Sequence, residues 1–512
     1  MSQTDTSANN KRIAKNTLML YIRMLITMVV GLFTSRVVLQ TLGVEDYGIY
    51  AVVGGIVSMF TFLNGGMISA THRYLNFELG RGNQEQLSKV FSTSVQIHAL
   101  ISLIVLLLSE TIGLWFLYEK LVIPAERLDA AFWVFQFSIV ACVVNIISVP
   151  YNAVIVAHEK MSAFAYMSIL DVVLKLLIVY LLYISPWDKL VVYAALLLCV
   201  GLLLCWIYAR YCQKHFQEAH YRHHFEKSLL KEMFSFSGWS LWGHLAAMLY
   251  TQGVNMMLNI FFGPVVNAAR GLAGQIHGVV LGFVGNFQMA LNPQITKSYA
   301  NGDLAQMHSL MFRSARFSFF LLFFLALPIL IEANYILQLW LGKFPEDTVV
   351  FMRWIIGTSL IYTVANPCVI ANQATGKVKV YQAVVAGILL LILPASYIAL
   401  VLGAPAYSVF VVHFCVENIA QFSRMYMLRK LINLPLREYL NHIYLPIVIV
   451  VLVSILLPIY LHCQMSEGFL RLVCVCTVCV ISVGCTVFLL GLTKGERSFF
   501  TSKIVHLLKI KR

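Results

Sequence analysis

Four basic side chains lie deep within long apolar segments of the sequence, where lipid would otherwise exclude a charge. They are Arg23, Arg36, Lys175 and Arg270. Charged groups inside a membrane are costly, so they usually face a bundle interior or a water-filled cavity. A guanidinium also grips phosphate oxygens through two parallel hydrogen bonds. Because the only deep acids are Asp171 and Glu417, this excess of positive charge predicts a cavity for an anion too polar to cross lipid unaided.

Structural explanations exist for some of these charges. Arg23 and Arg36 lie several residues inside the two ends of one segment, so each side chain can extend to its nearer interface. Asp171 stands four residues before Lys175, an order that favours an ion pair within one helix. Such a pair either helps the helix tolerate lipid or takes part in function, since removing one partner leaves a bare charge. Both explanations stay open.

Polar residues also follow one face of each of two neighbouring segments, at the period of a helix. In the first segment they are His244, Gln252, Asn255 and Asn259, and in the second Asn267, Arg270, His277, Gln288 and Asn292. Such groups either bond helix to helix or line a hydrated cavity, and the presence of Arg270 favours the cavity. Beside the second stripe, Gly274, Gly278 and Gly282 predict that a neighbouring helix packs closely.

The elements that must position these groups are apolar segments that recur along the chain. Of the 512 residues, 60% are hydrophobic and 12% charged, and the mean hydropathy is +0.79. Segments of about 20 apolar residues suit a bilayer core of about 30 Å, so the sequence predicts an all-α polytopic membrane protein. We expect about fourteen spans, at 16–42, 47–70, 88–116, 128–156, 162–184, 190–213, 233–262, 265–292, 310–331, 350–371, 380–402, 405–428, 440–462 and 469–492.

The distribution of lysine and arginine predicts the orientation of the chain. With the N-terminus inside, 27 of the 37 basic residues fall on the cytoplasmic side, 6 outside and 4 within spans. This bias follows the positive-inside rule, so we expect both termini on the cytoplasmic side of the membrane. The net charge of +14 then reflects topology and contact with anionic lipid, and no nucleic acid partner is expected. The first span is too long for a cleaved signal peptide.

Two halves of the sequence match at three places. Gly43 pairs with Gly263 and Gly82 with Gly302, both at an offset of 220 residues, while "PYNAVIVAHEK" and "PCVIANQATGK" match at an offset of 217. A repeat of six helices predicts two pseudo-symmetric lobes, with substrate bound at their interface. The predicted parts are a tail at 1–15, an N-lobe at 16–215, a linker at 216–232, a C-lobe at 233–430, two further helices at 431–492 and a basic tail at 493–512.

Metal and enzyme chemistry find little support in the residue pattern. Most of the eleven cysteines lie within spans, and the linker histidines have no carboxylate or cysteine at ligand spacing. We therefore expect no metal and no cofactor. The longest outer loop, "EANYILQLWLGKFPEDTVV", is too short and apolar for a catalytic domain, which argues against a glycan polymerase or ligase.

Three stretches carry a resemblance to a known family: "SRVVLQTLGVEDYGIYAVVGGI", "SVPYNAVIVAHEKMSAFAY" and "LNIFFGPVVNAARGLAGQI". They resemble the oligosaccharide flippases of bacterial O-antigen and capsule export (Wzx-type), within the multidrug/oligosaccharidyl-lipid/polysaccharide exporter superfamily. The resemblance implies two six-helix lobes, alternating access and an undecaprenyl-diphosphate-linked oligosaccharide as cargo. It also implies cavity arginines, for which the candidates by helix are Arg23, Arg36, Arg73 and Arg270. It does not extend to the identity of the sugar.

These observations give one set of expected site residues and one alternative function. We expect the diphosphate and glycan to contact Arg23, Arg36, Arg73, Arg270, Lys175, Gln252, Asn255, Asn259, Asn267, His277 and Gln288. Asp171 and Glu417 are the candidates for ion coupling. A monomer is expected, with polysaccharide polymerase or assembly proteins as partners. A multidrug/cation antiporter of the same fold is the alternative, and it would need deep carboxylates that are not already paired.

Overall fold

The computed structural model describes most of the chain between residues 16 and 501. The gaps fall at 32, 35–36, 39–40, 43–45, 47–48, 51–52, 55–56, 58–61, 120–122, 223–225, 263, 342–343 and 499–500. Arg36 therefore lies outside the described residues. The side chains of Gln252, Asn259 and Asn267 also lie outside the description.

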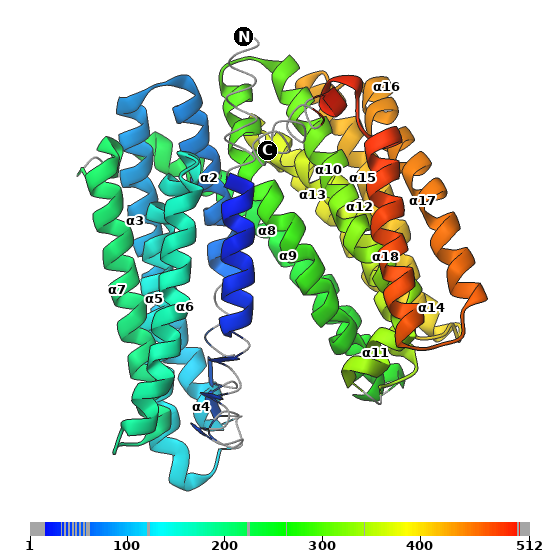
Figure 1. Cartoon of the computed structure of the whole chain (residues 1–512). Coiled ribbons are helices and arrows are strands. Elements are labelled where there is room, and N and C mark those ends of the chain that lie inside the picture. Colours follow the sequence, from blue (N-terminus) through cyan, green and yellow to red (C-terminus); the bar gives the residue numbers. More distant parts are fainter. Residues whose placement is uncertain are drawn as a thin grey trace, which may run out of the picture. The chain divides into compact units, whose positions relative to one another are not determined.

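The described residues form helices, with no strand among them, which confirms the predicted all-α class (Figure 1). After a helix over Asn16–Gly31 come α2 (Phe62–Arg81), α3 (Gln84–Leu108), α4 (Leu114–Glu119), α5 (Leu128–Ala157), α6 (Met161–Ile184), α7 (Lys189–His215), α8 (Lys227–Phe262) and α9 (Pro264–Ala300). The order continues with α10 (Leu304–Ile331), α11 (Ala333–Leu341), α12 (Asp347–Thr375), α13 (Val378–Leu390), α14 (Ile392–Val401), α15 (Ser408–Ile432), α16 (Leu436–Tyr439), α17 (Leu445–Gln464) and α18 (Phe469–Thr486). Short 3-10 or π-helical segments, labelled η, join several of these helices or extend them, and the last is the π-helical segment η5 (Val487–Gly491).

Ten helical segments in the described part of the chain are long and apolar enough to cross a membrane. Each coincides with one of the predicted spans, and the helix over Asn16–Gly31 is apolar but shorter. α9 and α15, with 37 and 25 residues, fall outside this set although they are long. Both helices carry charged and amide side chains along their length, so they are more polar than the ten candidate spans. A polar helix of this length needs a polar neighbour or a cavity to face.

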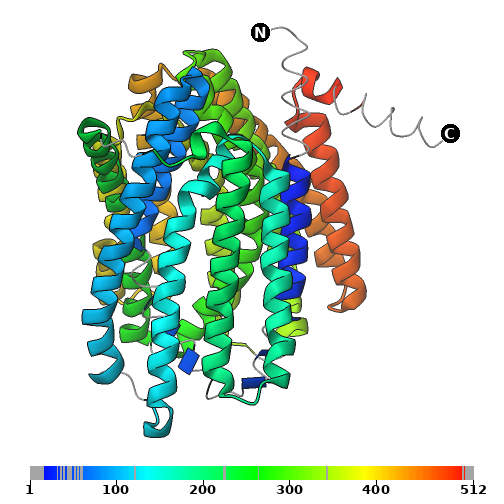
Figure 2. The same ribbon diagram turned by 90° about the vertical axis from the view of Figure 1, so that its left-hand side faces the viewer.

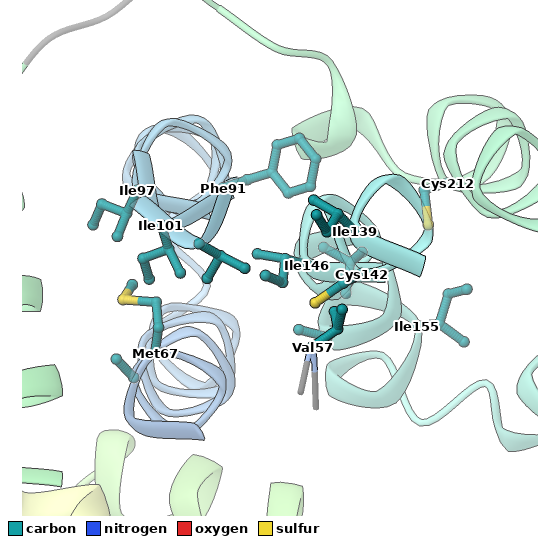
Figure 3. Close-up of a cluster of buried hydrophobic side chains, with 14 of the residues drawn as sticks. Val57, Met67, Phe91, Ile97, Ile101, Ile139, Cys142, Ile146, Ile155 and Cys212 are labelled. Carbon is teal, nitrogen blue, oxygen red and sulfur yellow. The ribbon is translucent and has the colours of Figure 1, made fainter. Parts of the chain in front are cut away.

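The structure divides into two compact units, each with its own core. Unit 1 comprises Met1–Leu245, Met289–Leu304 and Gln373–Ala383. In it α5 packs against α3 and α7, with α6 alongside (Figures 1 and 2). Ile101 of α3 and Met67 of α2 point toward one another, and Ile146 of α5 points into the same cluster (Figure 3). Burying these apolar side chains drives the packing of α2, α3 and α5.

Unit 2 comprises Ala246–Gln288, Ala305–Asn372 and Val384–Arg512. Its core joins α8, α9, α12 and α15, with the rings of Phe351 and Phe410 4.6 Å apart. α17 and α18 pair side by side (Figure 1). Buried Glu332, at the end of α10, accepts hydrogen bonds from Arg471 of α18 at 3.0 Å and pairs with His462 of α17 at 2.8 Å. The C-terminal helix pair is thus fastened to the rest of unit 2. The lobe boundaries expected from the sequence stay predictions.

Matched backbone turns support the sequence repeat. Gly82 and Gly302 both have positive φ, of +70° and +74°, and each follows the end of a helix. The N–H of each bonds three residues back and the next N–H bonds five residues back, which is a helix-ending arrangement that glycine favours. Glu159 and Gly376, 217 residues apart, also share positive φ, of 57° and 75°. Equivalent turns therefore occupy equivalent places in the two halves.

Candidate functional site

A cavity of about 370 Å³ lies within unit 2, between α8, α9, α12 and α15. We call it the arginine cavity. Its polar lining residues are Tyr250, Thr251, Arg270, His277, Thr358, Ser359, Tyr362, His413 and Glu417. The cavity explains why α9 and α15 are more polar than their neighbours, because both turn polar side chains toward it. Arg270 and His277, two of the residues predicted from the stripe on α9, are brought together here.

Arg270 is the charged group that sets the character of this cavity. One of its terminal nitrogens donates to the backbone carbonyl of Thr251 at 2.8 Å. It forms no salt bridge with any residue that the structure describes. A guanidinium has five N–H donors, so most remain available to an anion in the cavity. A carbonyl orients the side chain but does not neutralise it.

Glu417 also lines the arginine cavity, but its charge is already neutralised. Arg424 donates to its carboxylate at 2.7 Å, and both side chains are only 3% exposed. Two histidines, His277 and His413, also line the cavity, and the His413 ring lies edge-on to Tyr250 at 5.3 Å between centroids. With Glu417 paired to Arg424, Arg270 contributes the uncompensated formal charge of the lining. The arrangement therefore suits an anionic group with hydroxyls around it.

A second cavity, of about 540 Å³, lies within unit 1 between α5, α6 and α7. We call it the ion-pair cavity. Lys175 donates to Asp171 at 2.8 Å inside it, which confirms the pairing predicted from their spacing on one helix. Amides, hydroxyls and aromatic rings make up the rest of its polar lining, namely Tyr50, Asn145, Ser148, Asn152, Ser168, Tyr193 and Tyr208. This lining offers many neutral hydrogen-bonding groups and no net formal charge.

Two further predicted cations that the structure describes, Arg23 and Arg73, make their contacts elsewhere in unit 1. The Arg23 guanidinium, half-buried, lies over the ring of Phe164 on α6, 4.9 Å from its centroid. Arg73 on α2 is 8% exposed, lies over the Tyr74 ring at 4.3 Å, and donates from Nε to the carbonyl of Gln373 at 3.1 Å. A β-carbon at position 376 would collide with this guanidinium, so the close approach requires Gly376. Neither arginine is among the residues that line the two cavities.

A second contact in unit 1 mirrors the one made by Arg73. Glu159, buried in the turn that ends α5, accepts hydrogen bonds from Lys297 at 2.9 Å and Gln294 at 3.1 Å, both from the end of α9. Asn16 donates to its backbone carbonyl at 3.1 Å. By the repeat, Glu159 corresponds to Gly376, so each equivalent turn holds a basic side chain from a helix of the other sequence half. We call these two contacts the paired clasps.

The amides of the polar stripes have different surroundings. Gln288 donates to Ser318 Oγ and to the Thr363 carbonyl, both at 3.1 Å, so it bonds helix to helix within unit 2. Asn255 is half-buried on α8 and is not among the cavity-lining residues. The close packing predicted at Gly274 and Gly278 is wrong, because a β-carbon at either would meet no atom within 4 Å. Gly274 instead lines the arginine cavity, where the absent side chain leaves space.

Sequence reasoning missed the lining residues on α12 and part of α15. Thr358 and Tyr362 are four residues apart, as are His413 and Glu417, so each pair shares one helical face. The four-residue spacing indicates a shared polar face. Hydroxyl groups are common in apolar helices, so this spacing alone does not identify a cavity lining. Among the residues that the structure describes, no group of three or more His, Cys, Asp or Glu side chains is placed to hold a metal ion.

Comparisons with known proteins agree on the class of protein. Residues 13–299 match the family described as "Polysaccharide biosynthesis protein". No curated protein matches the sequence.

Solved structures with the same fold are distant in sequence. A MATE transporter in its bent conformation has 14% identity and a TM-score of 0.70, over 84% of this chain and 97% of its own. A mutant MATE transporter of Vibrio cholerae has 16% identity and a TM-score of 0.65, over 84% and 99%. A MOP superfamily transporter from Pyrococcus furiosus, described as having a binding pocket of reverse polarity that suggests a different function, has 14% identity and a TM-score of 0.65, over 82% and 96%. At these identities the likeness shows the fold.

Proposed function

Because the chain belongs to the polysaccharide biosynthesis protein family and has the fold of multi-pass membrane transporters, we propose that it is a lipid-linked oligosaccharide flippase. Its cargo is an undecaprenyl-diphosphate-linked oligosaccharide, moved from the cytoplasmic to the periplasmic leaflet of the bacterial inner membrane for O-antigen or capsule assembly. The observation that carries this proposal is Arg270, a guanidinium without a carboxylate partner among the described residues, in a hydroxyl-lined cavity.

The arginine cavity supplies the chemistry that a diphosphate sugar needs. The free N–H donors of Arg270 bind phosphate oxygens, and the low dielectric of the surroundings strengthens that contact. Thr358, Ser359 and Tyr362 present hydroxyls for neighbouring oxygens of the cargo. Gly274 leaves room beside them. His277 lies about two turns further along the same face of α9 and offers a donor or an acceptor according to its tautomer.

The ion-pair cavity provides a different kind of surface for the same cargo. Its amides, hydroxyls and tyrosine rings suit sugar hydroxyls and the apolar faces of sugar rings. Asp171 and Lys175 neutralise each other there, so the cavity does not compete with Arg270 for the diphosphate. We assign the glycan to this kind of lining and the diphosphate to Arg270.

Alternating access requires contacts that form in one state and break in another, and the paired clasps are suited to that role. The partly exposed Lys297 forms an ion pair with the buried carboxylate of Glu159, while Arg73 binds a carbonyl and lies over the Tyr74 ring. Both lie at the ends of helices that the charge distribution predicts to be cytoplasmic. In this proposal the clasps form in one state of the transport cycle and separate in another. Asp171, Glu417 and His277 remain the candidates for coupling to an ion gradient.

The test compares two arginines of unit 2 that both bind a backbone carbonyl. Arg270→Ala removes the cavity guanidinium, while Arg353→Ala removes an arginine whose Nε donates to the Leu330 carbonyl at 3.2 Å outside the cavity lining. In a strain that lacks its own flippase, we expect Arg270→Ala to lower surface polysaccharide by about a hundredfold, from loss of charge-assisted hydrogen bonds. Arg353→Ala should leave it nearly unchanged. Equal polysaccharide from both variants at equal protein levels removes Arg270 from the mechanism.

A cation antiporter is the second candidate, and the MATE fold is the observation that favours it. An antiporter needs a carboxylate that can bind a cation, whereas Glu417 is paired with Arg424 and Asp171 with Lys175. Drug susceptibility separates the two candidates. Deleting a flippase gene should remove surface polysaccharide without changing drug tolerance, and the reverse pattern identifies an antiporter.

A further inference from the structure

A third cavity, of about 490 Å³, lies within unit 2 and shares no lining residue with the arginine cavity. Its walls come from the first turns of α10, the connection from α15 to α16, and the segment that follows η5. We call it the C-terminal pocket. Four of its lining residues carry basic side chains, namely His308, Arg313, Arg316 and His442. Two are acidic, Glu438 and Glu496.

Arg316 is the buried group at the base of the C-terminal pocket. The residue is 3% exposed, and one terminal nitrogen donates to both carboxylate oxygens of Glu496, at 2.6 and 2.5 Å. The other donates to the His442 carbonyl at 3.3 Å. Its Nε has no hydrogen-bond partner among the described residues. A buried guanidinium with an unused donor has capacity for one more acceptor than the carboxylate provides.

Arg313 brings a second guanidinium to the same carboxylate. Its Nε lies 3.7 Å from a Glu496 oxygen, and its side chain is 37% exposed. Two guanidiniums around one planar anion is an arrangement that proteins use for carboxylate and phosphate groups. Inorganic phosphate carries more negative charge and two more oxygens than a carboxylate, so it satisfies this pair more fully. The phosphodiester of a lipid headgroup presents two free oxygens and one negative charge, so it can replace a carboxylate here.

Glu496 reaches the arginines from a short turn near the C-terminus and has another local role. The Thr493 N–H donates to the Glu496 carboxylate at 2.9 Å, and the Glu496 N–H donates to Thr493 Oγ at 3.4 Å. This reciprocal pair is a capping box, which satisfies the first N–H groups of the turn. The Glu496 carboxylate therefore keeps a partner in its own turn when it leaves Arg316. Its contact with the pocket is exchangeable.

We propose that the C-terminal pocket binds a phosphate-bearing anion and that the Glu496 carboxylate occupies its place in the present state. The walls lie at helix ends that the charge distribution predicts to be cytoplasmic, where anionic lipid headgroups gather. Binding transfers Arg313 and Arg316 from Glu496 to the phosphate and frees the turn that begins at Thr493. The chemistry is shared by a phospholipid headgroup and by soluble phosphate, and the experiment distinguishes them.

Full-length protein in nanodiscs provides the test, with two carboxylate variants as a matched pair. Glu496→Gln removes the competing charge and keeps a side chain that can still cap its turn. Glu438→Gln removes the other carboxylate of the pocket, which forms no salt bridge among the described residues. Phosphate binding is measured by titration with inorganic phosphate in phosphatidylcholine nanodiscs. Lipid binding is measured by native mass spectrometry after reconstitution with phosphatidylglycerol.

We expect Glu496→Gln to bind the anion about tenfold more tightly than the natural chain, and Glu438→Gln to change binding by less than about threefold. Arg313→Gln should weaken binding about tenfold, and it is chosen over Arg316 because its side chain is partly exposed. A gain with inorganic phosphate assigns soluble phosphate, and a gain only with phosphatidylglycerol assigns the headgroup.

Trypsin provides an independent readout of the turn. Lys494 and Arg497 are cleavage sites within it, and Arg497 donates to the Leu489 carbonyl in the present state. The bound anion should accelerate cleavage there by several-fold in the natural chain. The proposal is overturned when neither probe binds, when the two glutamate variants behave alike, or when Arg313→Gln binds as tightly as the natural chain.

Discussion

The arginine cavity and the ion-pair cavity both contain charged side chains from apolar helices, but the charges have different partners in the two cavities. In the ion-pair cavity Lys175 and Asp171 pair within one helix, and their side chains are 45% and 27% exposed. In the arginine cavity the carboxylate of Glu417 is taken by Arg424, which leaves Arg270 with a backbone carbonyl. The first arrangement gives a neutral polar surface. The second gives an anion site, because the acid that could neutralise Arg270 is already paired.

The largest effect should come from breaking the buried ion pair between Glu417 and Arg424. Arg424→Gln leaves a carboxylate buried without its charge partner, which should lower the free energy of unfolding by about 3–5 kcal/mol. Arg429→Gln, on the exposed face of the same helix, should change it by less than about 1 kcal/mol. Reversible denaturation in detergent measures both. The double variant Glu417→Gln with Arg424→Gln should recover much of the loss, and equal stability of the two single variants contradicts this account.

The second largest effect should come from Arg270→Lys, which tests whether the arginine cavity needs the paired N–H donors of a guanidinium or only a positive charge. Arg270→Lys keeps the charge but loses the paired N–H groups that grip a phosphate. We expect flippase activity to fall about tenfold, between the natural chain and Arg270→Ala, when surface polysaccharide is measured at equal protein levels. Activity equal to that of the natural chain would show that charge alone suffices.

Sequence patterns predicted those parts of the site that depend on neighbours along one helix. The pairing of Asp171 with Lys175 follows from their spacing, and Arg270 with His277 from the helical period. The apolar spans follow from length and hydropathy, and the matched turns at Gly82 and Gly302 from the repeat. Each of these depends on residues close together in the sequence or on a stretch of sequence that recurs in the second half.

Contacts between distant residues were not predictable from the same patterns. Arg73 binds a carbonyl 300 residues away, and its guanidinium is held by a turn instead of lining either cavity. Gln288 lies on the predicted stripe but bonds to Ser318 and Thr363, because the fold places those helices beside it. Helical periodicity states which residues share a face, whereas only the packing states what that face meets.

A third, smaller effect should appear when one partner of the ion pair in the ion-pair cavity is removed, so that the other charge is left unpaired. Asp171→Asn leaves Lys175 without its partner, and Lys175→Met leaves Asp171 without its partner. Because both side chains are partly exposed to the cavity, each change should cost about 1 kcal/mol of unfolding free energy, well below the loss for Arg424→Gln. The same detergent denaturation measures it. The unfolding free energy of the double variant, Asp171→Asn with Lys175→Met, should be closer to that of the natural chain than that of either single variant. A loss above about 3 kcal/mol in a single variant would contradict this account, because it would equal the loss expected from breaking the buried pair of Glu417 and Arg424.

The smallest effect comes from exchanging the two charges of that pair. Asp171→Lys with Lys175→Asp keeps the cavity neutral but reverses the order that favours an ion pair on a helix. The change should cost only about 0.2–0.5 kcal/mol of unfolding free energy and leave surface polysaccharide unchanged. Arg270→Asp, which gives the arginine cavity the opposite charge, should abolish the polysaccharide in the same strain. Loss of surface polysaccharide in the Asp171→Lys, Lys175→Asp variant would contradict this account. It would mean that Asp171 or Lys175 is needed at its own position, as a coupling residue is, and that a neutral cavity is not sufficient.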